Sequence, residues 1–422
     1  MVYSLIFFLP ILFFFTSCAS HDVHLNEYRE FDPTFFKEID KHALSTPSSA
    51  EKSIPILTEY LTSISNKEID KVRSIYIWVT DRIAYDTNFS KSNLHINQSI
   101  ESILKTRIAN AEEYSKLFLS LCKQAGIDSN LVNGYSKGLS YYPGKIFKEA
   151  DHSWNAVKID GEWRLIDTTW GAGNVYDNKF KKEFSDFYFL THPKKFISDH
   201  FPLETKWQLL HEPQSKIDFY NKPKKYSAFF SNYFENLSPD LGVLSTDDYL
   251  EVSFENPKKV QLVVSLGNEK QFTYIKQNKN KYTIEVRAPG VGVYDLKVYG
   301  KVSSTSGPLP IVLEQKIQFH KKNAKGVYPE ILDHTKIQIK YPKVGTLKNG
   351  QIPFSFQVND AQEIAFVDEL NDWQIFSPKE GSLFTGSVLL EEGEIKVFAK
   401  YDSSLKSSSN SWHEIMKFHV IK

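Results

Sequence analysis

The chain has 422 residues, enough for about three domains at roughly 100–200 residues per domain. Its 51 basic and 51 acidic residues cancel, and because nucleic-acid-binding proteins normally carry a basic excess, no nucleic-acid partner is expected. Aromatic residues make up 14% of the chain and favour strands, so a large β component is expected.

Two cysteines, Cys18 and Cys122, are present. They are too few for a disulfide framework, a cysteine zinc site or a CxxC redox motif. The histidines show no HxxxH or HxH spacing and there is no glycine-rich phosphate loop, so we expect neither a metal nor another cofactor. If the protein were a cysteine enzyme, Cys122 would have to be the nucleophile.

The N-terminal segment resembles the signal sequence of a bacterial lipoprotein. Residues 5–15 (LIFFLPILFFF) form an apolar run that is too short to span a bilayer but typical of a signal peptide. Small residues lead into Cys18 as in a lipobox, although no Lys or Arg precedes the apolar run. The resemblance implies a signal peptide over residues 1–17, lipidation of Cys18, and a lipid-anchored protein of the bacterial cell envelope. A plain signal peptide or a short anchor helix is the alternative.

Helical spacing dominates the next part of the chain. Residues 18–50 are polar and are expected to form a tether, with one short helix near residues 33–43. Over residues 54–85 apolar side chains recur every three or four positions, which predicts helices with one apolar face.

The clearest predicted helix begins at about Ala111 and ends at Gly126. Asn110 and Glu113 have the spacing of a capping box at its start. The apolar positions that follow form one continuous helical face, which includes Cys122.

After this helix the pattern changes to short alternating segments. Residues 130–135, 153–159 and 163–167 read as antiparallel strands, and the last two are joined by an Asp160-Gly161 turn. Helices followed by strands predict an α+β domain over residues 51–215, with helices on one face of a sheet.

The remainder of the chain reads as strands and repeats itself weakly. The segment that starts at Val252 resembles the one that starts at Phe354, an offset of about 100 residues. This period fits two tandem β-sandwiches of immunoglobulin size, over residues 222–320 and 326–422, without the Cys…Trp…Cys signature of antibody domains.

The densest group of chemically versatile residues lies in residues 151–173. His152 and Asp167 fall on the two strands of a predicted hairpin, which can bring the imidazole against the carboxylate. The carboxylate would hold one ring nitrogen and leave the other free to act as a base. Such a pair can also be purely structural, because it satisfies two buried polar groups. Trp154 and Trp170 crowd the same region, as a core or a cleft wall would.

The motifs around this pair resemble the transglutaminase-like, papain-fold superfamily, in the variant seen in kyphoscoliosis peptidase-type proteins. H-x-W-N-x-V starts at His152, and G-x-W-x-L-I-D-x-T-W-G-A-G starts at Gly161. The resemblance extends over residues 75–86, 103–138 and 188–210. It implies a papain-like α+β domain followed by immunoglobulin-like β-sandwiches.

In that family a Cys, a His and an Asp form the triad, with the Cys in the first turn of a helix, where the dipole favours a thiolate. The resemblance carries over His152 and Asp167 but puts Ala111 at the nucleophile position, in the stretch RIANAEEYS. An alanine methyl cannot attack a carbonyl. The adjacent Glu112 and Glu113 would oppose a thiolate electrostatically, since like charges disfavour each other.

Three other side chains come into question as nucleophiles, and none is well placed. Cys122 lies about 16 Å beyond Ala111 along the helix axis at 1.5 Å per residue, on the apolar face, where a small buried hydrophobe is the simpler interpretation. Ser115 is one turn into the helix, and Ser153 should point to the strand face opposite His152.

The sequence therefore predicts a catalytically inactive transglutaminase-like lipoprotein that binds a peptide or protein in the cell envelope, not an enzyme. His152 and Asp167 would be triad remnants, and Trp154, Trp170 and Tyr135 are the candidate ligand contacts. Two alternatives stay open. One is an active cysteine-peptidase or transglutaminase-type enzyme that uses an unrecognised nucleophile with His152 and Asp167, and the other is a purely structural envelope protein.

Overall fold

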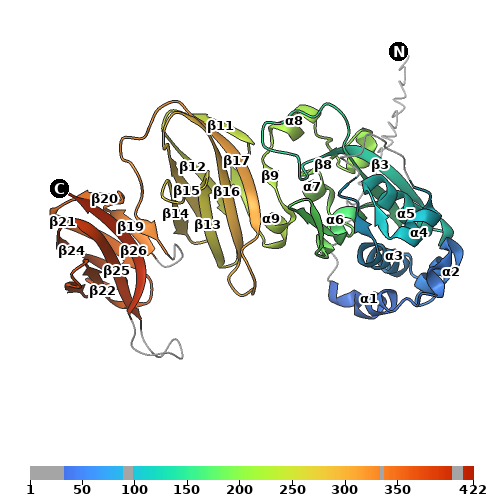
Figure 1. Cartoon of the computed structure of the whole chain (residues 1–422), viewed down its shortest axis with the longest axis horizontal. Helices are drawn as coiled ribbons and strands as arrows, with labels where there is room; N and C mark the ends of the chain where they lie inside the picture. The colour runs from blue at the N-terminus through green and yellow to red at the C-terminus, as the bar shows by residue number, and fades with distance from the viewer. Residues whose placement is uncertain (1–32, 89–97, 333–336, 402–411) are drawn as a thin grey trace, which may run out of the picture.

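The computed structural model describes residues 33–88, 98–332, 337–401 and 412–422. Three bodies follow one another along the long axis of the molecule in chain order (Figure 1). The predicted signal peptide and Cys18 lie outside the described residues. Among the helices that are described, none is long and apolar enough to cross a membrane.

The N-terminal body combines helices with a small antiparallel sheet, as predicted for an α+β domain. Its helical elements are η1 (Pro33–Phe36), α1 (Lys37–Leu44), η2 (Ala50–Lys52), α2 (Ile54–Thr62), α3 (Glu68–Arg82), α4 (Ile100–Thr106), α5 (Ala111–Gln124), α6 (Thr168–Ala172), η4 (Asp186–Tyr188), α7 (Pro193–Phe196) and η5 (Thr205–Gln208). Its strands are β1 (Ala84–Tyr85), β2 (Ile108–Ala109), β3 (Ser129–Ser136), β4 (His152–Ile159), β5 (Glu162–Ile166), β6 (Gly173–Tyr176), β7 (Lys179–Lys182) and β8 (His200–Pro202).

The main sheet of this body has the strand order β5-β4-β3-β8, with every pair antiparallel. Side chains on alternate positions of β4 enter different cores, because a strand turns successive residues to opposite faces. Val157 and Ile159 join the core of the helices, whereas Trp154 and Ala156 join a second, aromatic core on the other face. The sheet therefore lies between the helical layer and the loops that follow β5.

Residues 33–50 pack against the helical layer and do not form a tether. Phe36, Ile39 and Ala43 are buried in the same core as α3 and α5. The tether predicted over residues 18–50 is wrong for this stretch. Three apolar side chains spaced along one helix face are enough for docking, even in a segment whose overall composition is polar.

The second body is a β-sandwich that closes around its own apolar core. One sheet has the order β10-β12-β15-β14 and the other β11-β17-β16-β13, with β9 paired to β17. Helix α8 (Lys216–Asn221) precedes the sandwich (Figure 1) and packs its Phe219 against Tyr135, Phe147 and Phe201 of the N-terminal body. The elements of the sandwich are β9 (Lys224–Lys225), α9 (Ser227–Ser231), β10 (Glu235–Ser238), β11 (Val243–Thr246), β12 (Tyr249–Glu255), β13 (Val260–Leu266), β14 (Thr273–Asn278), β15 (Lys281–Arg287), β16 (Gly292–Val302) and β17 (Ile311–Phe319).

The third body repeats this arrangement, which confirms the predicted repeat. Its sheets have the orders β19-β21-β24 and β18-β26-β25-β22-β23, and β20 pairs parallel to β26 as β11 pairs parallel to β17. The elements are β18 (Glu330–Ile331), β19 (Ile337–Tyr341), β20 (Thr346–Lys348), β21 (Gly350–Val358), β22 (Ala361–Val367), β23 (Trp373–Phe376), β24 (Leu383–Leu390), β25 (Gly393–Tyr401) and β26 (Trp412–Ile421).

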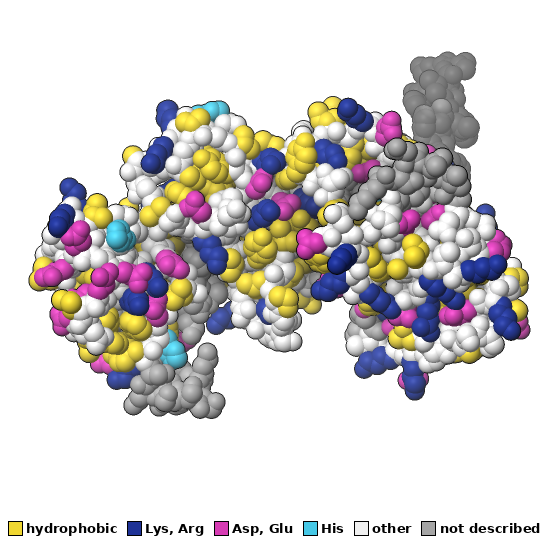
Figure 2. All heavy atoms as spheres, viewed as in Figure 1, with side chains coloured by type: hydrophobic (Ala, Val, Ile, Leu, Met, Phe, Trp, Pro, Cys, Tyr) yellow, Lys and Arg dark blue, Asp and Glu magenta, His cyan; other side chains and the backbone are white. Residues whose placement is uncertain are grey.

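The junction between the first two bodies is closely packed. Lys137, which follows β3 and is buried, donates from Nζ to the carbonyl oxygens of Lys222 at 2.9 Å and Pro223 at 3.1 Å. Lys224 in turn donates to the carbonyl oxygen of Gly138 at 2.9 Å. Basic and acidic side chains intermingle on the surface of the N-terminal body in the view of Figure 2, as the zero net charge of the chain suggests.

Candidate functional site

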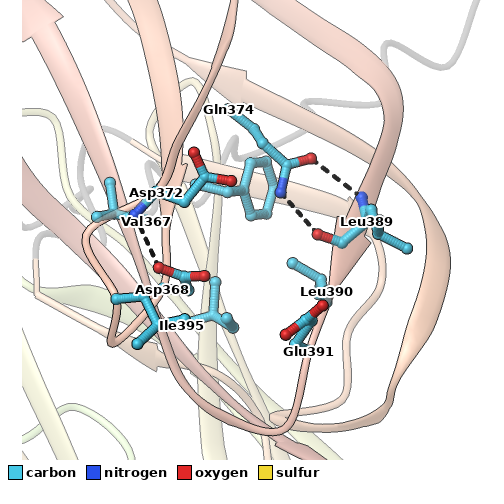
Figure 3. A pocket seen from close by; sticks show the side chains of 10 residues that line it. Val367, Asp368, Asp372, Gln374, Leu389, Leu390, Glu391 and Ile395 are labelled. Carbon is cyan, nitrogen blue, oxygen red and sulfur yellow. Dashed lines mark hydrogen bonds between the residues drawn. The ribbon is translucent and has the colours of Figure 1, made fainter.

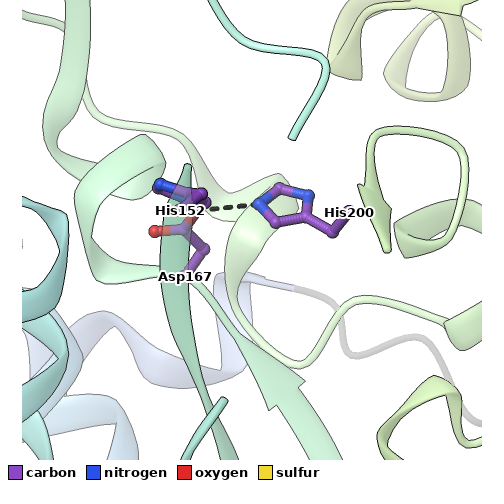
Figure 4. Close-up of side chains that lie close together, drawn as sticks. All are labelled: His152, Asp167 and His200. Atoms are coloured by element: carbon purple, nitrogen blue, oxygen red, sulfur yellow. Dashed lines mark hydrogen bonds and ion pairs between the residues drawn. The ribbon is translucent and has the colours of Figure 1, made fainter. Parts of the chain in front are cut away.

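The predicted His–Asp pair meets at one end of the main sheet. His152 is the first residue of β4, and Asp167 directly follows β5, its hairpin partner. His152 Nε2 lies 2.7 Å from Asp167 Oδ2 (Figure 4). An ionised carboxylate can only accept, so Nε2 of His152 is the donor and its Nδ1 is left over. Within the described part of the chain, Nδ1 has no hydrogen-bond partner.

A second histidine, His200 at the start of β8, completes the group. Its Nε2 lies 2.9 Å from the same Oδ2 of Asp167, and its Nδ1 lies 2.6 Å from Oδ1 of Asp199. The ring is stacked on Phe196 with 4.1 Å between the centroids, and it is fully buried. The two histidines therefore flank one carboxylate oxygen (Figure 4).

Asp167 has all its acceptor positions filled. Its Oδ1 caps α6 by accepting from the backbone N–H groups of Thr169 at 2.7 Å and Trp170 at 3.0 Å. Burial by itself raises the pKa of Asp167, but its interactions with His152 and His200, including a hydrogen bond from each ring, outweigh burial and hold this pKa well below its usual range. The group is therefore a carboxylate.

The charge state of His200 follows from its two acidic neighbours. Burial lowers the pKa of His200, whereas the charge of Asp199 and the hydrogen bonds to Asp167 and Asp199 raise it; the balance raises the pKa to about 9. His200 is therefore an imidazolium at neutral pH.

Helix α5 begins at Ala111, as predicted, and the capping box is present. The side chain of Asn110 accepts from the backbone N–H of Glu113 at 3.0 Å, and Glu113 accepts from the backbone N–H of Asn110 at 2.8 Å. The other carboxylate oxygen of Glu113 accepts from the backbone N–H of Gln98 at 2.6 Å. Glu113 is therefore engaged in holding the helix start, while Glu112 pairs with Lys116 one turn on.

The start of α5 lies at the same end of the domain as the start of β4. Asn155 of β4 donates to the carbonyl oxygen of Ser115 at 3.0 Å, which fixes the two elements side by side. Ala111 lies four residues before Ser115, about 6 Å along the helix axis. His152 lies three residues before Asn155, about 10 Å along the strand. Helix α6, which follows Asp167, packs against both α3 and α5 and closes this end.

Cys122 lies at the opposite end of the domain. Its thiol is fully buried, and burial raises its pKa far above the ordinary value, an effect that the nearby Ser129 hydroxyl reduces only in part. Ser129 pairs with Val157, five residues along β4 from His152 and so about 16 Å away. Cys122 is a core residue, as predicted.

The two serines are engaged elsewhere. Ser115 Oγ donates to the carbonyl oxygen of Ala111 at 2.9 Å. Ser153 Oγ donates to Oδ1 of Asn133 at 2.7 Å, on the strand face opposite His152. Among the described residues, no hydroxyl or thiol contacts Nδ1 of His152.

The three candidate ligand contacts differ in accessibility. Trp154 is 1% exposed and packs edge-on against His200, so it belongs to the core and cannot reach a ligand. Tyr135 is almost buried, with Nζ of Lys216 over its ring at 3.8 Å. Trp170 is half-buried, 5.3 Å from the His152 ring, and is the only one of the three with substantial exposure.

A cavity of about 600 Å³ lies on the connection between β3 and β4, and His152 itself does not line it. It includes Asp151, the neighbour of His152, and the aromatic rings of Tyr142 and Phe147. Tyr142 and Ile146 on the same connection are well exposed. The sequence did not single out this connection.

A smaller hollow of about 190 Å³ lies in the third body, far from these residues in the chain (Figure 3). Its floor is apolar, and Asp368, Asp372 and Glu391 stand at its rim. Gln374 closes one side by exchanging two hydrogen bonds with the backbone of Leu389. None of the sequence-predicted site residues lines it.

Among the described residues, His152, Asp167 and His200 are the only grouping of three or more potential metal ligands. Their contacts of 2.7 and 2.9 Å are hydrogen-bond lengths, and both histidine nitrogens must carry protons to make them. A metal ion would have to displace both protons and push the ligands apart. The group as it stands is a hydrogen-bond network.

Sequence reasoning missed His200 and Asp199. They lie 33 and 32 positions after Asp167, in a segment with no regular spacing, and reach it only because β8 pairs with β3 at Ser136. The adjacent Asp-His pair in the sequence was the one available signal.

Two family models match parts of the chain. Residues 56–168 match the family model of the transglutaminase-like superfamily, and residues 217–330 match the model of the KY-like, immunoglobulin-like domain. The N-terminal body is therefore a transglutaminase-like domain, and a KY-like, immunoglobulin-like domain follows it.

The particular relatives are kyphoscoliosis peptidases and related proteins. The chain is 33% identical over 273 residues to the human kyphoscoliosis peptidase, covering 64% of this chain and 41% of that protein. The mouse protein is 32% identical over 277 residues, covering 65% of this chain and 42% of that protein. Hillarin from Drosophila melanogaster is 31% identical over 218 residues, covering 47% and 26% respectively. The chain thus spans about two fifths of the length of the kyphoscoliosis peptidases.

Proposed function

We propose that this chain is a catalytically inactive transglutaminase-like protein that binds a peptide or protein segment in the bacterial cell envelope. The observation that carries the proposal is Ala111 at the start of α5, where the family pattern has its nucleophilic cysteine. Covalent catalysis needs a nucleophile within hydrogen-bond reach of its base. The described residues offer none at Nδ1 of His152.

Three features support binding without turnover. Cys122 is buried about 16 Å from His152 along the sheet. Glu113 is tied into the capping box and to the backbone of Gln98, so its side chain is held at the helix start. The cavity on the β3–β4 connection, lined in part by the exposed Tyr142, offers room and apolar contact for an extended segment.

The envelope location and the anchor are part of this proposal. They rest on the lipobox-like sequence before Cys18. A diacylglycerol on that thiol would hold the protein at a membrane surface by its acyl chains. Mass spectrometry of the N-terminal peptide from cells checks this: an unmodified Cys18, or a mature chain that starts elsewhere, would contradict the anchor.

One observation favours a second candidate function, an active enzyme with an unrecognised nucleophile. His152 keeps its carboxylate partner and an open Nδ1, which is the arrangement of a general base. This candidate requires measurable turnover in the unaltered chain.

The decisive experiment restores the missing thiol. In a chain carrying Cys18→Ser, the variant Ala111→Cys should react with iodoacetamide at least about tenfold faster than the same variant with His152→Ala, because an imidazole activates a nearby thiol. The parent, whose remaining Cys122 is buried, should not react under native conditions.

Peptide hydrolysis and amine incorporation are measured alongside, on the parent and on His152→Ala. The proposal expects no turnover in either. Turnover in the parent that disappears in His152→Ala would contradict the proposal and favour the second candidate, an active enzyme. Equal thiol reactivity in the two Ala111→Cys variants would show that Ala111 is not at the nucleophile position. Protection of Trp170 from fluorescence quenching by envelope peptides separates binding from a purely structural role, with Trp170→Phe as the control.

A further inference from the structure

His200 lies between two buried carboxylates. Asp167 on one side and Asp199 on the other are both within 3 Å of a ring nitrogen, and all three side chains are almost completely shielded from water. Two carboxylates cannot be buried together without a compensating positive charge, because desolvation of an unpaired charge is costly.

Among the described residues, four side chains that can carry a positive charge lie near these carboxylates: Lys137, Lys224, His152 and His200. Lys137 lies in the field of Asp199, but its Nζ is engaged with the carbonyl oxygens of Lys222 and Pro223. Lys224 points at the carbonyl oxygen of Gly138. Of the two carboxylates, His152 contacts only that of Asp167. Only His200 contacts both carboxylates.

We propose that His200 is a positioning residue that carries the positive charge of this buried cluster, and thereby leaves His152 neutral with its Nδ1 lone pair open to a hydrogen-bond donor. In this arrangement Asp167 receives an N–H from each histidine, but its charge is balanced by His200. His152 then needs no second proton. In Figure 4 the free ring nitrogen of His152 points away from His200.

The other titratable side chains around His200 do not change the charge of this cluster. The pKa of Tyr188, whose hydroxyl bonds to Asp199 at 3.3 Å, is raised well above its ordinary value by burial, and the same holds for Tyr76 and Tyr114 near Asp167. All three phenols are therefore neutral. The carboxylate of Asp151, beside His152, accepts from the backbone N–H of Ser136 at 2.8 Å.

The protonation state of His152 determines which ligand groups the site can bind, an inference that rests on the proposed binding function. A neutral imidazole whose Nε2 already donates can offer only an acceptor at Nδ1. The site would then recognise a backbone N–H or a hydroxyl of the bound segment. It would not recognise a carboxylate, which an imidazolium would attract.

The test is a ¹⁵N spectrum of the histidine rings of the full chain at pH 7 without any ligand, so its outcome does not depend on the proposed function. Both ring nitrogens of His200 should be protonated, and His152 should be the neutral tautomer with the proton on Nε2. In Asp199→Asn, the group beside Nδ1 of His200 loses its negative charge, so His200 should become neutral and His152 should gain a second proton. This transfer is a spectroscopic change that a merely structural role of His200 would not produce.

The matched control is Asp151→Asn, which removes a carboxylate beside His152 but not one that touches His200. It should leave both rings in their original states. A neutral His200 or a doubly protonated His152 in the unaltered chain overturns the proposal. An unchanged His152 in a folded Asp199→Asn variant overturns it as well, and His200→Gln repeats this second comparison if Asp199→Asn does not fold.

Discussion

At the scale of single residues, the site is organised by one carboxylate. Asp167 directly follows strand β5, caps helix α6 with one oxygen and accepts from two histidines with the other. Because β4 and β5 form a hairpin, the sequence predicts the contact between Asp167 and the first histidine, His152. The second histidine changes the electrostatics, because His200 carries a charge that the motif around His152 does not reveal.

Removing His200 should change how stability depends on pH. A histidine whose pKa is raised to about 9 in the folded chain binds its proton more tightly there than in the unfolded chain. Its contribution is fully present below the ordinary histidine pKa of about 6.5 and is lost as the pH rises through about 9. We therefore expect the unaltered chain to exceed His200→Gln in unfolding free energy by a few kcal/mol at pH 6 and by much less at pH 10.

Urea unfolding followed by tryptophan fluorescence measures this difference. The exposed His211→Gln is the control and should show no such trend. A difference between the unaltered chain and His200→Gln that is the same at both pH values would contradict the charge assigned to His200.

At the scale of elements, the docking of α1 depends on a buried guanidinium. Arg73 of α3 is 1% exposed and binds both oxygens of Asp40 on α1 at 2.7 Å. Its third contact is Asp186 of η4, at 2.5 Å. One side chain thus ties three elements that are far apart in the sequence.

Arg73→Met should therefore destabilise the first domain by about 2 kcal/mol, less than for a fully buried pair, because both carboxylates keep partial contact with water. Chemical denaturation of the full chain checks this value. Arg82→Met is the matched control on the same helix. Its pairs are partly exposed, so it should cost less than about 1 kcal/mol. Equal losses in the two variants would show that Arg73 does not hold α1 in place.

At the scale of the whole molecule, the transglutaminase-like domain and the first sandwich are joined by buried lysines. Lys137 is enclosed at the junction, and burial lowers its pKa to about 7. Its amine bonds to carbonyl oxygens of the next body, so the junction carries a charge at low pH that it sheds near neutrality.

The contribution of Lys137 to stability should rise with pH, whereas that of His200 falls. Below pH 7 the folded chain must bury an ammonium group, which costs stability. Between pH 7 and about 10.5 the unfolded chain holds more protons than the folded one, so stability rises with pH. The melting temperature of the unaltered chain should therefore rise relative to Lys137→Met between pH 6 and pH 9.

Calorimetry at both pH values tests this expectation. The exposed Lys148→Met serves as a control and should follow the unaltered chain. If the difference between the unaltered chain and Lys137→Met falls with pH, the buried lysine keeps its proton and the assignment is wrong.

Features that depend on local spacing could be predicted from the sequence. The α5 capping box, the β4–β5 hairpin and the repeat of the two sandwiches all follow from residues within a few positions of one another, or from alternation that sets which face of a strand is buried. The meeting of His152 and Asp167 belongs here too, because a tight hairpin leaves little freedom in register.

Contacts between segments far apart in the chain became visible only in the folded structure. Residues 33–50 looked polar, yet Phe36 and Ile39 find a core that their own segment does not provide. Strand β8 brings His200 to Asp167 by pairing with the far side of β3, and Lys137 meets the next body across more than eighty residues of chain. Such contacts depend on how whole elements pack, and local pattern carries no information about them.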